Sequence, residues 1–170
     1  MSSRESMIGA QRRRSFLVTV CIVGALLGLA QVAGAIDVVV TGDWSRTITT
    51  ADLVGGIGTD LASSYESASN QVLISISNTT GPGDAWRIDV HRTDGTWSGS
   101  LTVSVKRTGT GGGSVAGGAA YQAITTSAVS FFTGSDDVTD IPIQLKLDGM
   151  SLQIAPDTYS TTVTITVVDI

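Results

Sequence analysis

The aspartates of the segment GSDDVTDIP are the first candidates for chemistry in this sequence. Asp136, Asp137 and Asp140 fall within five consecutive positions of a polar stretch. Ca²⁺ takes several oxygen ligands, and clustered carboxylates supply them. The cluster therefore predicts a calcium site, with a solvated acidic turn as the alternative, since the spacing is not that of an EF-hand loop.

Side chains for acid-base or nucleophilic catalysis are scarce. His91 is the only histidine, and no GxSxG segment occurs that would present a serine for a Ser-His-Asp arrangement. Beyond residue 35, Glu66 is the only glutamate, so a two-carboxylate glycosidase would depend on aspartates. We therefore expect no enzymatic activity and no cofactor other than the candidate calcium ion.

The three tryptophans offer a second kind of site. Trp44, Trp86 and Trp97 could stack on sugar rings if they shared an exposed face. Trp86 continues the apolar side of an alternating segment, however, and this pattern favours a core position.

Alternating apolar and polar residues dominate the chain after residue 35. Such a period of two places successive side chains on opposite faces of a strand, so that one face is buried. The pattern is clearest in QVLISIS, AWRIDVHR, WSGSLTVSVKR, DIPIQLKLDG and TYSTTVTITV. Helix is scarce, and only one short helical turn is expected, near Asp52.

Turn signals separate these segments. Asp94-Gly95 and Asp148-Gly149 are typical of two-residue hairpin turns, which need positive φ. Pro142 lies inside a strand pattern and has no N–H for a ladder, which predicts an edge strand. Eight or nine strands without crossover helices predict an all-β fold, an antiparallel β-sandwich formed by residues 36–170 as a single domain.

Residues 1–35 have the pattern of a cleavable signal-peptide helix. Arg12, Arg13 and Arg14 precede an apolar run over residues 16–30, and Ala33-Gly34-Ala35 is a small-residue cleavage site. The run is shorter than the roughly 20 residues that a membrane span needs. RRSFL resembles the twin-arginine export motif, and ordinary Sec export remains the alternative.

Removal of the leader changes the balance of charge. The leader holds four of the ten basic residues and one of the fifteen acidic residues, so the remaining chain has six basic and 14 acidic side chains and a formal net charge of −8. This charge argues against nucleic acid and anionic membrane surfaces as partners. Cys21, the only cysteine, lies in the leader, so no disulfide is expected in the mature domain.

The segment PDTYSTTVTITV, residues 156–167, resembles the closing strand of secreted fimbrial and spore-coat-U-type pilin domains. The resemblance covers one strand and implies a β-sandwich subunit that polymerises by strand donation.

Two functions remain open at this point. The leading hypothesis is an exported structural or interaction protein, a secreted or cell-surface β-sandwich subunit that assembles into a fibre or layer with itself or with other surface proteins. In a Gram-negative host that retained it, the protein would be periplasmic. The alternative is a secreted module that binds a glycan or another ligand with the help of calcium. The segment IDVVVTGDW could pair with a neighbour's edge strand, and we prefer the hypothesis that it forms the first strand of its own sheet.

Overall fold

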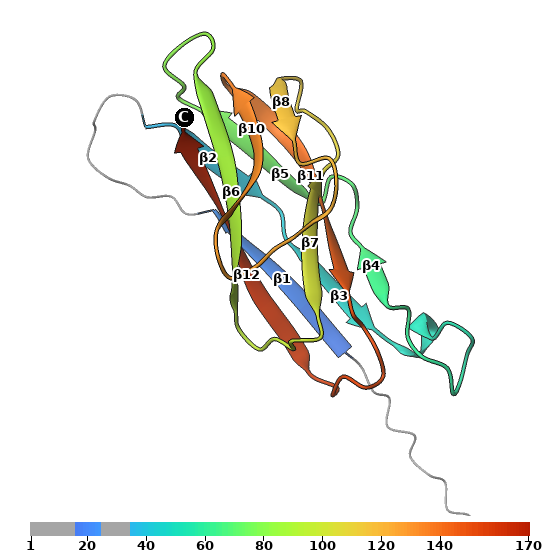
Figure 1. Cartoon of the computed structure of the whole chain (residues 1–170). Helices are drawn as coiled ribbons and strands as arrows, with labels where there is room; N and C mark the ends of the chain where they lie inside the picture. Colours follow the sequence, from blue (N-terminus) through green and yellow to red (C-terminus); the bar gives the residue numbers. More distant parts are fainter. Residues whose placement is uncertain (1–15, 25–34) are drawn as a thin grey trace, which may run out of the picture.

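Two packed β-sheets form the domain (Figure 1). The computed structural model describes residues 16–24 and 35–170. Within these residues the helical content is one 3₁₀ turn, η1 (Thr50–Asp52), which Thr49 caps by accepting a hydrogen bond from the N–H of Ala51 at 3.3 Å. The all-β class expected from the sequence is confirmed.

Each sheet has six strands, and every pairing except one is antiparallel. The first, which we call the β12 sheet, has the order β3 (Trp44–Ile48), β1 (Phe16–Gly24), β12 (Thr158–Asp169), β6 (Ala85–Asp94), β10 (Val129–Ser135) and β8 (Ser114–Gly117). The second, the β11 sheet, has the order β2 (Asp37–Thr41), β5 (Val72–Ser77), β11 (Val138–Asp148), β7 (Thr102–Arg107) and β9 (Gln122–Ala123), with β4 (Ser64–Glu66) also paired to β11. The exception is β1, which runs parallel to β12.

The core lies between the sheets and is made by the alternation seen in the sequence. In β6, Trp86, Ile88 and Val90 are fully buried while the residues between them are half-exposed. The same alternation buries one face of β5, β11 and β12. Trp86 packs edge-on against Phe132 with ring centroids 6.0 Å apart, which confirms its predicted core position.

Two Asp-Gly pairs that were predicted to form hairpins make a different kind of connection. Asp94-Gly95 lies between β6 and β7, and Asp148-Gly149 lies between β11 and β12. In both cases the flanking strands belong to opposite sheets, so the hairpin prediction is wrong. The second glycine is required for another reason: Gly149 has a φ of 90°, and a Cβ there would overlap the carbonyl of Ser100.

Pro142 is also placed differently from the prediction. It lies in β11, between β5 and β7, and not on an edge strand. Its carbonyl oxygen accepts from the N–H of Thr108 at 2.9 Å, one residue beyond the end of β7. In an antiparallel ladder the N–H and C=O of one residue point to the same side. The N–H that proline lacks would therefore point toward β7, at the position where the ladder with β7 has ended.

Strand number and the leader segment differ from the sequence-based expectation as well. The structure has eleven strands after residue 35, where eight or nine were expected, because β4, β8 and β9 are only two to four residues long. Residues Phe16–Gly24 form a strand, and not part of the expected signal-peptide helix. They find hydrogen-bonding partners on both sides in the β12 sheet, which a leader helix would not have. The leader arginines Arg12, Arg13 and Arg14, and residues 25–34 before the predicted cleavage point, lie outside the described residues.

The close approach of Gly134 to Trp86 gives a test of the packing. A Cβ at Gly134 would overlap the Trp86 ring, so Gly134→Ala is expected to lower the free energy of unfolding by about 1–3 kcal/mol, the usual cost of overpacking. Gly99→Ala is the matched control, because nothing lies within 4 Å of a Cβ there. Urea denaturation followed by tryptophan fluorescence measures both. Equal stability of the two variants would contradict the packing described.

Candidate functional site

The predicted calcium ligands lie at the start of β11 and the turn before it, where they organise loops. Asp136 accepts from the N–H of Gly83 at 2.6 Å, and Asp137 accepts from the N–H and hydroxyl of Thr79 at 3.0 and 2.8 Å. These bonds fasten the β5–β6 loop to the β10–β11 turn. These hydrogen bonds give Asp136 and Asp137 a structural role that needs no metal ion.

Asp140 lies in β11 itself, at a break in the register with β5. Its backbone has a φ of 55°, and its N–H donates to the hydroxyl of Ser75 at 3.0 Å. In residues 16–24 and 35–170, no group of three or more histidine, cysteine, aspartate or glutamate side chains is arranged to hold a metal ion. Calcium binding stays a prediction for measurement.

His91 and Glu66 lie apart, on different sheets. His91 is half-exposed on β6, in the β12 sheet, and Glu66 is exposed on β4, in the β11 sheet. Near Glu66, the Nζ atoms of Lys106 and Lys146 lie 4.3 and 4.8 Å from the ring centroid of Tyr121. Burial, with the neighbouring Glu66 carboxylate, raises the pKa of Tyr121 to about 12, so its hydroxyl stays protonated at neutral pH.

The tryptophans do not share an exposed face. Trp44 and Trp86 are buried in the core. Trp97 is half-buried, donates from Nε1 to the carbonyl of Leu101 at 3.2 Å, and carries Arg92 over its ring. Stacking of a sugar on a shared tryptophan surface is therefore not available to this fold.

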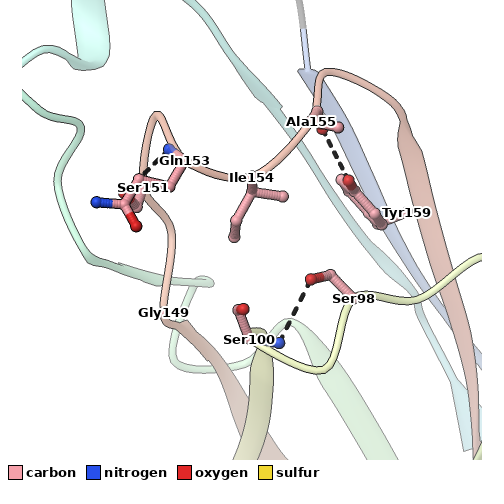
Figure 2. Close-up of a pocket in the computed structure, with 8 residues that line it drawn as sticks. All are labelled: Ser98, Ser100, Gly149, Ser151, Gln153, Ile154, Ala155 and Tyr159. Carbon is pink, nitrogen blue, oxygen red and sulfur yellow. Dashed lines mark hydrogen bonds between the residues drawn. The ribbon is translucent and has the colours of Figure 1, made fainter.

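A polar pocket of about 490 Å³ lies where the β6–β7 loop meets the β11–β12 connection (Figure 2). Ser98, Ser100, Ser151 and Gln153 contribute hydroxyl and amide groups, and no charged side chain lines it. Tyr159 closes one side and donates its hydroxyl to the carbonyl of Ala155 at 2.7 Å (Figure 2). The lining suits a neutral ligand with hydrogen-bonding groups.

Asp60 supports this pocket from outside. It accepts at 2.8 Å from the N–H of Leu152, which lies between two pocket residues, and at 2.8 Å from the N–H of Leu61. These amide bonds, led by that of Leu152, lower the pKa of Asp60, and the hydroxyl and amide of Thr79 lower that of Asp137. Both carboxylates thus prefer the charged state in the folded protein.

The most unusual feature is the position of β1 between β3 and β12 (Figure 1). Residues 17–24 pair with residues 158–165 of β12, and residues 16–20 pair with residues 44–48 of β3. β1 is the only described strand with which β3 forms a ladder. We call the space between β3 and β12 the strand slot. Its occupant comes from the predicted leader.

The backbone of β12 along the slot needs a partner. Ser160 donates its N–H to the carbonyl of Thr96 at 2.7 Å, on the β6 side. Backbone groups of successive strand residues point to opposite sides, so those of Thr161, Val163 and Ile165 point toward β1. Without β1 these groups would form an open sheet edge, which can pair with another chain.

The slot also opens onto the core. Tyr159, Thr161, Val163 and Ile165 of β12 are buried, as are Trp44 and Ile48 of β3. Removal of a strand between them would expose apolar side chains as well as a backbone edge. Tyr159 also lines the polar pocket, so the pocket lies at one end of the slot.

The strand slot was not found from the sequence, although a signal for it exists. Five of the nine residues of FLVTVCIVG are β-branched, a composition that favours strands over helices. Its length and apolar character also fit a signal peptide. The signal-peptide interpretation concealed the strand propensity.

No known protein-family model matches the chain, and no curated protein matches it significantly. Within the residues that the structure describes, no helix is long and apolar enough to cross a membrane.

Acid should weaken the fold through the carboxylates whose pKa is lowered in the folded protein, Asp60 and Asp137 among them. A folded-state pKa below the ordinary 3.8 stabilises the protein above that pH, and the stabilisation is lost as pH falls through the folded-state pKa. The melting temperature is therefore expected to decrease when the pH is lowered beyond about 4. In Asp137→Asn this decrease should be smaller. Asp43→Asn is the control, because no hydrogen bond to the Asp43 carboxylate occurs among the described residues. An identical acid profile for wild type and Asp137→Asn would contradict this.

Proposed function

We propose that this protein is an exported β-sandwich subunit of a surface or extracellular assembly, and that the strand slot is where a strand of another polypeptide joins it. The observation that carries the proposal is the pairing of leader residues 16–24 with both β3 and β12. If the leader is removed at Ala35, the mature domain has two facing edges and no strand between them.

Strand addition suits the chemistry of these edges. An incoming strand gains main-chain hydrogen bonds, and alternate side chains provide specificity. Opposite the buried residues of β12 the incoming strand needs apolar side chains, because a charge placed there would lose its hydration without a partner. The expected partner is thus an extended segment with apolar residues at alternate positions.

The position of the segment IDVVVTGDW favours a donor strand for the slot that comes from another part of the assembly. Asp37–Thr41 forms β2 and pairs with β5 in its own sheet, as preferred from the sequence. The strand that borders the slot, β12, is the segment that resembles the closing strand of pilin domains. The resemblance and the slot support the same kind of assembly.

Assembly should depend on the β12 edge. Thr164→Lys places a charge beside the slot, where it disfavours pairing with another strand, and is expected to weaken association at least severalfold. Thr166→Lys adds the same charge to the same face of β12, one position beyond the residues paired with β1, and should have little effect. Sedimentation velocity and negative-stain microscopy of the exported, leader-free protein measure both.

A leader-free protein that stays monomeric at every concentration, with or without surface proteins from the producing cell, would contradict the proposal. Equal association of the two lysine variants would place the contact elsewhere on the molecule.

The polar pocket favours a second candidate function, a glycan-binding module with or without calcium. Binding should stabilise the folded state by RT ln(1 + L/Kd), where L is the ligand concentration, so the melting temperature should rise with the logarithm of ligand concentration above Kd. We expect Gln153→Ala, at the pocket, to reduce a glycan-dependent rise and Gln71→Ala, away from it, to leave the rise unchanged. For calcium, the rise should be reversed by a chelator and reduced by Asp137→Asn. No rise with any glycan or with calcium would reject this candidate.

A further inference from the structure

We propose that residues Phe16–Gly24 have two roles: they form the apolar part of the export leader, and they close the strand slot until the leader is removed. Cleavage after Ala35 would then release the slot for its partner. This inference rests on the proposed function, because it names how the same slot is regulated.

The pairing of β1 is extensive enough for such a role. Eight consecutive residues pair in register with β12 and five pair with β3, without a bulge on either side. β1 thereby joins β3 to the rest of its sheet, and the backbone edge of β12 is covered along the whole buried part of that strand.

The leader sequence meets the demands of the slot at most of the paired positions. Val18, Val20 and Ile22 stand at the positions opposite buried side chains of β12. Their partners are Tyr159, Thr161 and Val163. The leader thus has apolar side chains at three of the four positions opposite buried residues of β12, and Gly24 at the fourth, opposite Ile165.

Covalent linkage makes the leader a strong competitor. A tethered segment acts at an effective concentration on the order of millimolar, with no loss of overall translational freedom on binding. A free donor strand at lower concentration would therefore be excluded while the leader remains attached. Cleavage ends this advantage because the same nine residues must then bind as a separate peptide.

The two roles exclude each other at any moment. While residues 16–24 are paired in the slot, they are not free for the export machinery, and while they engage that machinery the slot is open. The slot is therefore closed in the folded precursor and open in the exported, cleaved protein.

The chain's single cysteine provides a direct test in the full-length precursor. Cys21 is the register partner of Thr162 on β12. Directly paired positions on adjacent strands lie within the Cα separation that a disulfide allows, about 4.4–6.8 Å. Thr162→Cys should therefore form an intramolecular disulfide under mild oxidation in most molecules, seen as a reductant-sensitive shift on a denaturing gel.

Thr166→Cys is the matched control. It lies on the same face of β12, four residues farther along and outside the paired range, and should form at least tenfold less of the bond. A second pair, Thr19→Cys with Ser160→Cys in a Cys21→Ser background, tests the same register should either threonine variant fold poorly. Circular dichroism checks that each variant folds.

Failure of both in-register pairs to cross-link in folded precursor, or equal yields for Thr162→Cys and Thr166→Cys, would overturn the proposal. The outcome is separable from the proposed function. Cross-linking of the precursor together with a strictly monomeric cleaved protein would support leader closure and reject assembly. Assembly of the cleaved protein without cross-linking of the precursor would do the reverse.

Discussion

The exposed edges of a β-sheet are the physical constraint on which this structure depends. A strand inside a sheet must satisfy its main-chain groups on both sides, and unpaired groups that face the core are costly. β12 meets this requirement with β6 on one side and β1 on the other. Because β3 has its ladder with β1, the same nine residues hold together the side of the sandwich that contains Trp44 and Ile48.

The order of the strands makes this dependence stronger. From β5 to β12 each successive strand lies in the opposite sheet, and among the described residues no strand pairs with its neighbour in sequence. All ladders thus join segments that are distant in the chain, a topology whose loop-closure cost slows folding. The chain beyond residue 35 has no cysteine, so no disulfide within it offsets this cost. A tethered strand that covers the β12 edge would shield it during this slow process.

The sequence predicted which face is buried in the strands with clear alternation, such as β6, but not which strands are neighbours. A period of two in AWRIDVHR is enough to place Trp86 and Val90 in the core, because the pleat alone sets the alternation. Partner choice depends on connections, and Asp94-Gly95 suits a crossing between sheets as well as a hairpin. The aspartates near Asp137 were visible as a cluster, yet their hydrogen bonds go to a loop 58 residues away. The slot was missed because FLVTVCIVG satisfies the requirements of a leader and of a strand equally.

In the proposed assembly, this double suitability also bears on how the slot would discriminate among partner strands. Without residues 1–35 the chain has a formal net charge of −8, so two such copies repel each other, although salt screens that repulsion beyond roughly 8 Å at physiological ionic strength. Attraction at the slot is short-ranged, since it comes from backbone hydrogen bonds and apolar contacts. Under the proposed function, selection would therefore be made after encounter, by the register and by the side chains at alternate positions. A donor that presents apolar residues there, as the leader does with Val18, Val20 and Ile22, fits the slot, and one shifted by a single residue would place its other face against the core.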